Sequence, residues 1–222
     1  MKRSRIMLAA ATLGLCAFLT GSAGGQPAGG GKRSLGPRTI APPAPVWIIA
    51  SYDSAGRANM MTASWAGVCC SRPPCVAVSL REATYTYHCI MASEAFTVNI
   101  PSVDLAAAAA YAGTVSGRDT DKFAATGLTA VRSSLVNAPY LGECPLVLEC
   151  RLVRTVELGL HTMFIGEIVD VKADELILGE NGSPDPARHR AFVFSVGGYG
   201  FNEVGRTIGT VPELAGRYLG AD

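Results

Sequence analysis

One stretch of eight residues combines a cation, three serine or threonine hydroxyls and a helix start. Residues 79–86 read SLREATYT, so Ser79, Thr84 and Thr86 surround Arg81 where an apolar strand pattern gives way to a helix pattern. Hydroxyls, a guanidinium and the free N–H groups of a helix N-terminus together make an anion site, and a phosphate monoester fits it. The alternative is a solvated loop in which Thr84 caps the helix.

A second stretch has an unusual composition for a strand. Residues 59–65 read NMMTASW, a mixture of polar, small and aromatic side chains. Small residues in a strand let a flat ligand approach the backbone closely. The alternative is the ordinary alternation of a half-buried strand.

Other kinds of chemistry are excluded by what the sequence lacks. It contains no GxGxxG, P-loop, HExxH or GxSxG motif. His88, His161 and His189 are scattered, so no metal site is predicted. With 19 basic and 18 acidic residues the formal net charge is +1, which argues against a nucleic-acid-binding surface.

Six cysteines follow residue 60, and their spacing does not suggest a metal site. They lack paired CxxC spacing, although their even number leaves disulfides open. We predict small buried thiols on strands, because free cysteine packs as a compact apolar residue. The six are Cys69, Cys70, Cys75, Cys89, Cys144 and Cys150.

The elements that must position these segments are mostly strands. Runs rich in β-branched and aromatic residues predict strands at 45–52, 58–68, 75–80, 95–100, 146–157, 162–173 and 191–196. Helices are predicted at 85–92 and at 104–111, the latter with Ser102 as N-cap. Long strands with helices inserted in their connections indicate a mainly β fold, an antiparallel barrel that is closed or partly closed.

The N-terminus has the pattern of an export signal. Basic residues at 2, 3 and 5 precede an apolar run at 6–19 and then small residues, which predicts a signal peptide over residues 1–23. Fourteen apolar residues fall short of the roughly 20 that span a bilayer, so no stable membrane span is expected. A glycine-rich spacer over 24–34 follows. Export to the periplasm is the prediction; the alternative is an uncleaved apolar helix on a cytoplasmic protein.

Six blocks in order carry a further pattern. They are residues 59–65 (NMMTASW), 69–80 (CCSRPPCVAVSL), 81–87 (REATYTY), 96–101 (FTVNIP), 116–123 (SGRDTDKF) and 160–167 (LHTMFIGE). Together they resemble the flavin reductase-like, FMN-binding split-barrel family, in particular its flavoredoxin branch. The resemblance predicts a Greek-key split barrel that binds FMN over residues 35–200, with a C-terminal extension at 201–222.

The resemblance also implies site residues and partners. Residues 62–65 would line the flavin ring system, and Ser79, Arg81, Thr84 and Thr86 would hold the phosphate. His161 would lie on the side where NAD(P)H delivers hydride, or else be satisfied by loop backbone. The full implied FMN-binding set is Asn59, Met61, Thr62, Ala63, Ser64, Trp65, Ser79, Leu80, Arg81, Thr84, Thr86, Asn99, Lys122 and Phe123.

Three functions are compatible with that resemblance. The first is an FMN-dependent reductase that takes electrons from NAD(P)H or a protein donor. The second is a non-enzymatic FMN electron carrier that meets a redox partner protein, and the third is a flavin-binding barrel without turnover. Because flavin performs the redox chemistry itself, the absence of an acid–base pair or nucleophile is expected in each. Relatives of this kind pair as homodimers, which is the oligomeric state we expect.

Overall fold

The computed structural model describes residues 31–216 and 218–219. Residues 31–38 are exposed coil, and every helix and strand lies in the unit that begins at Thr39. The predicted signal peptide and most of the spacer lie outside the described residues. Within the described part, no helix is both long and apolar enough to cross a membrane.

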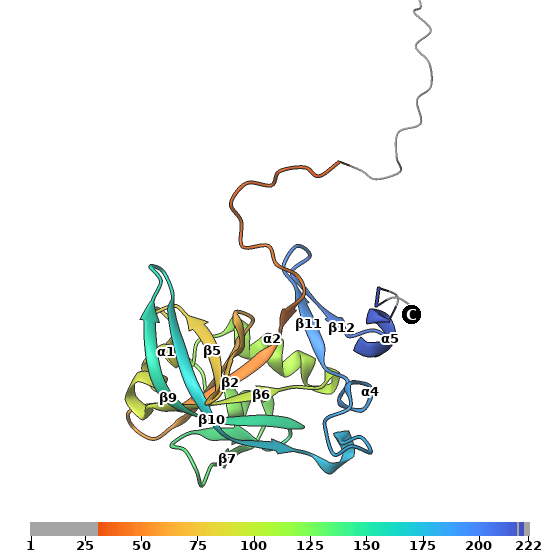
Figure 1. The fold of residues 1–222 in the computed structure, drawn as a ribbon. Helices are drawn as coiled ribbons and strands as arrows, with labels where there is room; N and C mark the ends of the chain where they lie inside the picture. Colours follow the sequence, from red (N-terminus) through yellow and green to blue (C-terminus); the bar gives the residue numbers. More distant parts are fainter. Residues whose placement is uncertain (1–30, 217, 220–222) are drawn as a thin grey trace, which may run out of the picture. The chain divides into compact units, whose positions relative to one another are not determined.

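The largest sheet is antiparallel throughout and dominates Figure 1. Its strand order is β3-β2-β6-β9-β10-β5-β4. The strands are β2 (Trp47–Tyr52), β3 (Ala58–Ala63), β4 (Ala66–Ser71), β5 (Pro74–Leu80), β6 (Ala95–Ile100), β9 (Leu146–Glu157) and β10 (Thr162–Ala173).

The two edge strands of this sheet are consecutive in the chain. Only Ser64 and Trp65 separate β3 from β4, so the sheet must curl round to bring its edges together. No ladder joins β3 to β4 within the described residues, and the curled sheet is therefore an open barrel. One hydrogen bond, from the Ser79 N–H to the Trp65 carbonyl at 2.9 Å, spans this corner.

Two hydrophobic clusters lie on opposite faces of the curled sheet. Alternation along β2 sends Ile49 to the inner cluster with Phe96, Val98 and Phe164. Ile48 and its neighbours on the other face pack against helices. Gly166 permits the tight inner packing, because a Cβ there would lie 2.5 Å from the Phe96 ring.

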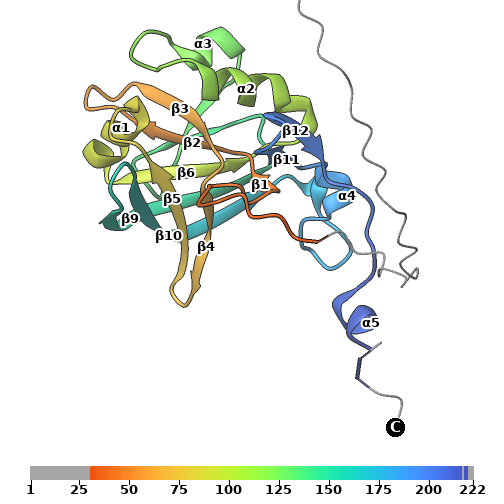
Figure 2. The ribbon, with the colours of Figure 1, turned by 90° about the horizontal axis from the view of Figure 1, so that it is seen from above.

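Helices pack against both clusters. Helices α2 (Ala106–Thr114) and α3 (Lys122–Thr126) cover the outer cluster and lie over β3 in Figure 2, whereas α1 (Tyr85–Ser93) packs its Ile90 against the inner cluster. Short elements complete the described chain: β1 (Ala44–Pro45), β7 (Ala130–Arg132), β8 (Pro139–Leu141), β11 (Phe192–Ser195), β12 (Gly200–Glu203), α4 (Pro186–His189), α5 (Val211–Ala215) and 3₁₀ turns at Val103–Leu105 and Glu175–Ile177. Strands β1, β11 and β12 form a second sheet, and β7 and β8 a third.

The predicted mainly β fold with inserted helices is confirmed, and several predicted boundaries are wrong. The single strand predicted at 58–68 is two strands, because the chain bends at Ser64 and Trp65 to cross from one sheet edge to the other. The helix predicted at 104–111 starts as a 3₁₀ turn and continues to Thr114. The Ser102 side chain makes no capping hydrogen bond.

The cysteine prediction is partly wrong as well. Cys75 and Cys150 are buried on strands as predicted, and all six described cysteines are free thiols. Cys69 and Cys70, in contrast, are exposed on β4, since their hairpin is at the sheet edge. The other two are buried away from strands: Cys89 in α1, Cys144 before β9.

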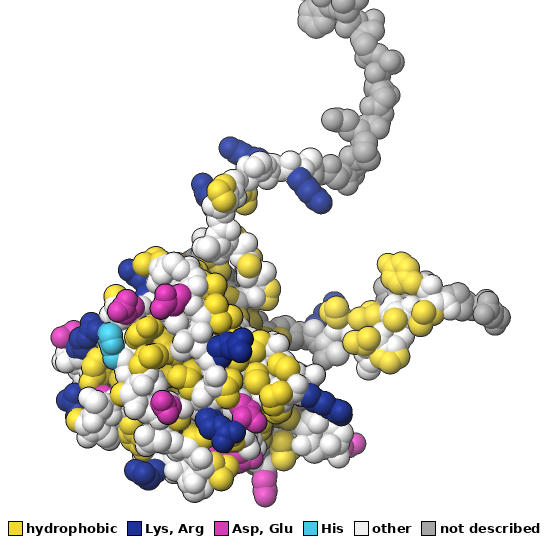
Figure 3. Space-filling model, turned by 60° about the vertical axis from the view of Figure 1, so that its left-hand side comes forward, with side chains coloured by type: hydrophobic (Ala, Val, Ile, Leu, Met, Phe, Trp, Pro, Cys, Tyr) yellow, Lys and Arg dark blue, Asp and Glu magenta, His cyan; other side chains and the backbone are white. Residues whose placement is uncertain are grey.

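Surface charge agrees with the near-neutral composition. On the face shown in Figure 3, acidic and basic side chains are interspersed among hydrophobic ones rather than gathered by sign. A polyanion such as nucleic acid has no continuous basic surface to bind on this face.

Candidate functional site

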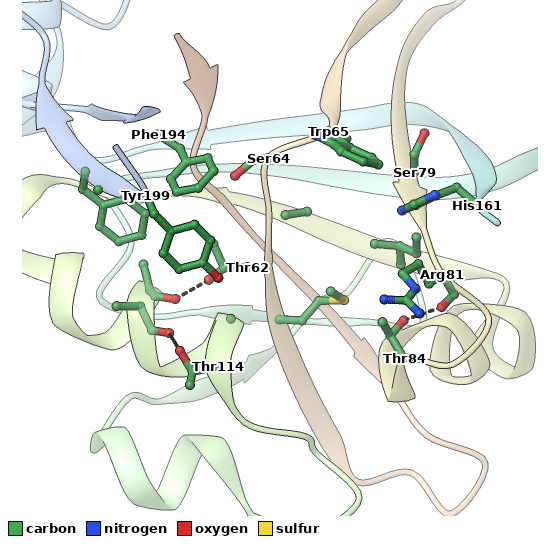
Figure 4. Close-up of a pocket in the computed structure, with 18 residues that line it drawn as sticks. Thr62, Ser64, Trp65, Ser79, Arg81, Thr84, Thr114, His161, Phe194 and Tyr199 are labelled. Atoms are coloured by element: carbon green, nitrogen blue, oxygen red, sulfur yellow. Dashed lines mark hydrogen bonds between the residues drawn. The ribbon is translucent and has the colours of Figure 1, made fainter. Parts of the chain in front are cut away.

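A pocket of about 480 Å³ lies where the two edges of the curled sheet meet (Figure 4). Five parts of the chain supply its walls: residues 61–65, residues 79–84, helix α2, the β9–β10 turn and the β11–β12 hairpin. Both chemically unusual segments of the sequence therefore face the same cavity. They meet because the Ser79–Trp65 hydrogen bond fixes the end of β5 against the bend between β3 and β4.

One end of the pocket is polar and cationic. Ser79, Arg81 and Thr84 line it, and within the described residues Arg81 takes part in no ion pair. Asp104, a conceivable partner for Arg81, instead lies 3.3 Å from Arg190. An exposed guanidinium with no carboxylate partner is available to an anionic ligand.

The Thr84 side chain does not cap helix α1. Its hydroxyl donates to the Arg81 carbonyl at 2.8 Å, and its N–H donates to the same carbonyl at 2.9 Å. This turn holds Arg81 beside the start of the helix. The first N–H groups of α1 thus have no side-chain cap, which favours the anion-site interpretation over the capped loop.

Helix α2 supplies a floor of small residues. Ala109, Ala110 and Gly113 face the pocket, and the Thr62 hydroxyl donates to the Ala109 carbonyl at 2.5 Å. A Cβ on Gly113 would lie 3.2 Å from the Thr62 Cβ, a tight contact, so glycine at this position lets the helix approach β3 closely. The result is a smooth wall against which a flat ligand can lie.

Two rings flank the entrance near Arg81. The Trp65 and His161 ring centroids lie 4.6 Å apart with a tilt of 49°, and Trp65 is 45% exposed. The His161 side chain makes no hydrogen bond within the described residues, although the loop backbone was its alternative partner. The ring is therefore positioned by its tilted contact with Trp65 and is accessible from the pocket.

The opposite end is aromatic. Phe194, Tyr199 and Phe201, from the β11–β12 hairpin, close this side of the pocket. The sequence predicts Phe194 in a strand (191–196) and Phe201 in the C-terminal extension (201–222). It predicts none of the three aromatic residues as a site residue. Together with the alanines of α2 they are what sequence reasoning missed.

A family model described as the flavin reductase-like domain matches residues 41–187. The chain belongs to the flavin reductase-like family. Flavoredoxin of Desulfovibrio vulgaris (Miyazaki F) is 46% identical, with 81% of this chain and 97% of that chain covered and a TM-score of 0.77. Flavoredoxin from Methanosarcina acetivorans is 26% identical over 85% of this chain and all of that chain, with a TM-score of 0.79.

A curated relative, an uncharacterized protein of Archaeoglobus fulgidus, is 36% identical over 127 residues, which is 57% of this chain and 71% of that protein. The predicted resemblance, including its flavoredoxin branch, is thus confirmed. The open barrel of the flavin reductase-like domain is the split-barrel fold of these relatives.

The structure brings ten of the fifteen predicted site residues of this flavin reductase-like domain to one pocket. These are Met61, Thr62, Ala63, Ser64, Trp65, Ser79, Leu80, Arg81, Thr84 and His161. Asn59 and Thr86 lie behind the wall instead, where the Asn59 amide donates to the Thr86 hydroxyl at 2.8 Å. This buried bond ties β3 to α1 and so positions the wall.

The remaining three predicted residues serve packing in this structure. Asn99 is fully buried and bonds the Ile48 carbonyl, the Thr97 hydroxyl and the Leu141 N–H. Lys122 is buried and donates to the Ala112 carbonyl at 2.7 Å, and its burial lowers the pKa of the ammonium to about 8. Phe123 belongs to the outer core cluster. None of the three lines the pocket.

No group of three or more histidine, cysteine, aspartate or glutamate side chains in the described part of the chain could hold a metal ion. The polar groups that line the pocket are hydroxyls, one guanidinium, one imidazole, the Trp65 indole N–H and backbone. This set suits an anionic organic cofactor.

Proposed function

We propose that this protein is an FMN-dependent oxidoreductase of the flavin reductase and flavoredoxin type, passing electrons from NAD(P)H or a protein donor through flavin to an acceptor. The observation that carries the proposal is the unpaired Arg81 beside Ser79 and Thr84, at one end of a pocket that is otherwise flat-walled and apolar. The likeness to flavoredoxin over nearly that whole chain supports it.

The pocket residues fit FMN in kind and in placement. Arg81, Ser79 and Thr84 would hold the phosphate, because a guanidinium and hydroxyls make charge-assisted hydrogen bonds to phosphate oxygens. The backbone N–H groups of residues 62–65 would hydrogen-bond the polar edge of the flavin ring system. The small residues of α2 leave room for a flat ring.

Bound flavin would supply the redox chemistry, accepting a hydride or single electrons. The chain's own residues bind, orient and exclude water. Trp65 and His161 stand at the mouth of the pocket, and we assign them to the side from which a nicotinamide ring would approach.

A pair of titrations tests the cofactor assignment. Arg81→Ala should weaken FMN about ten- to a hundredfold, since a charge-assisted contact is worth about 1.5–3 kcal/mol. Riboflavin has no phosphate, so its affinity should change little. Equal losses for the two flavins would show that Arg81 acts on the fold rather than on the phosphate. Arg118→Ala, at an exposed arginine bonded to the Ala83 carbonyl and absent from the pocket lining, is the matched control.

The second candidate is an electron carrier without NAD(P)H turnover. His161 is the one imidazole that lines the described pocket, and no carboxylate side chain lines the pocket beside it to form an acid–base pair. Steady-state oxidation of NADH or NADPH by the FMN-loaded protein supports the reductase. Electron transfer from photoreduced protein to a redox protein, without NAD(P)H oxidation, supports the carrier.

We further propose a homodimer and export. Exposed valines on strands β4, β9 and β10, namely Val68, Val153 and Val171, favour pairing with a second copy. Light scattering of the FMN-loaded protein at micromolar concentration should give twice the chain mass.

Mass spectrometry of the protein from its native envelope should show a mature N-terminus near Gly24, and an intact Met1 would contradict export.

A further inference from the structure

The β11–β12 hairpin is an aromatic wall anchored in the core and exposed at its tip. Phe192 is buried and lies 5.0 Å from Phe201, measured between ring centroids. Phe201 lies 6.2 Å from Phe194, and Phe194 lies edge-on to Tyr199 at 5.6 Å. The chain of rings thus runs from the outer core cluster to Tyr199, which is 89% exposed.

The backbone at the tip is held in an uncommon conformation. Tyr199 has a φ of +49°, one of three positive values among the described non-glycine residues. It follows Gly197 and Gly198 and precedes Gly200, so its neighbours in the turn place no side chains beside the ring, which contacts Phe194. Strained backbone of this kind persists at ligand clamps, where the orientation of one side chain matters.

The aromatic end of the pocket carries no charged side chain among the described residues. The Thr62 and Thr114 hydroxyls donate to helix carbonyls, those of Ala109 and Ala110, which leaves the Ser64 and Tyr199 hydroxyls as the polar groups at this end. The Arg81 guanidinium and the His161 imidazole lie at the other end, as Figure 4 shows. Chemistry at this end therefore favours an uncharged, planar ring rather than an ion.

We propose that the aromatic wall binds the ring of an uncharged planar electron acceptor of the quinone class, with Tyr199 as the residue that selects it. The inference rests on the proposed function, because the acceptor must meet reduced flavin in the same pocket. Each quinone takes up two electrons and two protons from the reduced flavin and leaves as the hydroquinone, and the flavin returns to its oxidised form.

Rapid mixing of the dithionite-reduced, FMN-loaded protein with two acceptors tests the inference. Menadione is an uncharged planar quinone, whereas ferricyanide has no ring to stack. We expect Tyr199→Ala to raise the menadione concentration for half-maximal reoxidation about tenfold, as for the loss of one aromatic contact. Tyr199→Phe should stay near wild type, and ferricyanide should reoxidise all variants alike. Tyr218→Ala removes an equally exposed tyrosine outside the pocket and is the control.

The outcomes separate the inference from the proposed function. An unchanged menadione dependence in Tyr199→Ala, with ferricyanide still active, overturns the acceptor site alone. Weaker FMN titration in Tyr199→Ala, with equal slowing for both acceptors, shows a flavin contact and also overturns it. A wild-type protein that binds no FMN, or that neither acceptor reoxidises, overturns the proposed function and the inference together.

Discussion

Two groups of polar residues, one at the pocket and one buried under the sheet, differ in whether their polar atoms have partners within the protein. At the pocket, Arg81 and the neighbouring hydroxyls face solvent, and the guanidinium has no carboxylate partner in the described chain. On the outer face of the sheet, opposite the inner cluster, Thr97, Asn99 and Glu149 form what we term the buried polar layer, and all three are fully buried.

Almost every polar atom of the buried polar layer has a hydrogen-bond partner. Thr97 donates to the Pro139 carbonyl, and Asn99 uses both its amide and its carbonyl. Glu149 accepts from Lys172 at 2.7 Å, and one carboxylate oxygen, Oε1, is left without a partner. Paired polar groups fix the fold, while unpaired ones at a pocket are available to a ligand. The difference predicts which substitutions affect stability and which affect binding.

The largest effect should come from removing the cation that pairs with the buried Glu149 carboxylate. Lys172→Met would leave the Glu149 carboxylate buried without its cation, at a cost of about 2–3 kcal/mol in unfolding free energy, less than for a fully buried pair because Lys172 is partly exposed. Urea unfolding measures the loss. The double variant Lys172→Met with Glu149→Gln should recover most of it. A loss in the single variant below about 0.5 kcal/mol would contradict this account of the layer.

Acid should remove the stabilising contribution of a second hydrogen-bonded carboxylate, that of Asp53. Burial alone would raise the pKa of Asp53, but hydrogen bonds from the Arg57 backbone, Tyr85, the Arg57 side chain and Ala55 lower it to about 2. Because the folded pKa lies below the unfolded value, this stabilisation is complete above about pH 5 and is lost as the pH falls towards 2, by about 2 kcal/mol in all. Asp53→Asn should unfold with a flatter pH dependence over that range. Parallel curves for the two proteins would contradict the assignment.

Lys122 is implied as an FMN-binding residue by the family resemblance, but it does not line the pocket. Because its ammonium bonds the Ala112 carbonyl and does not line the pocket, Lys122→Met should change FMN affinity by about threefold at most. Fluorescence titration of FMN measures the change. A loss comparable to that of Arg81→Ala would place Lys122 in contact with the flavin.

The smallest effect should be that of Arg81 on the flavin-free protein. With no ion pair to break, Arg81→Ala should alter unfolding free energy by less than about 0.5 kcal/mol without flavin. The same urea titration as for Lys172→Met measures it. A loss above about 1 kcal/mol would show that the pocket arginine belongs with the structural polar groups.

The strand runs, and the pocket position of the segment 79–86, could be predicted from the sequence because local pattern determines them. Residues 146–157 and 162–173 are β9 and β10 to the residue, and Arg81 lies at the pocket as its neighbours indicated. The bend at Ser64 was missed, since strand propensity runs on through it and only closure of the sheet requires the break. Asn99 and Lys122 are polar by type, and only their buried partners show that they serve packing.

The aromatic wall could not be predicted because it depends on distant pairing. Strand β11 is positioned by β1, through the Ala44–Phe194 register, and no local signal in the sequence reports that contact. A GGYGF segment reads as a turn, which it is, and its position against residues 61–65 is a property of the tertiary fold.

That pairing also sets the order in which the protein can become functional as it is made. The pocket needs residues from 61 to 201, and β1 must wait for a strand some 150 residues later before its sheet can form. A nascent chain that has completed β10 possesses the curled sheet and the arginine, yet lacks one wall. Because a ligand of the finished pocket stabilises only molecules that contain the last hairpin, cofactor uptake selects completed chains over truncated ones.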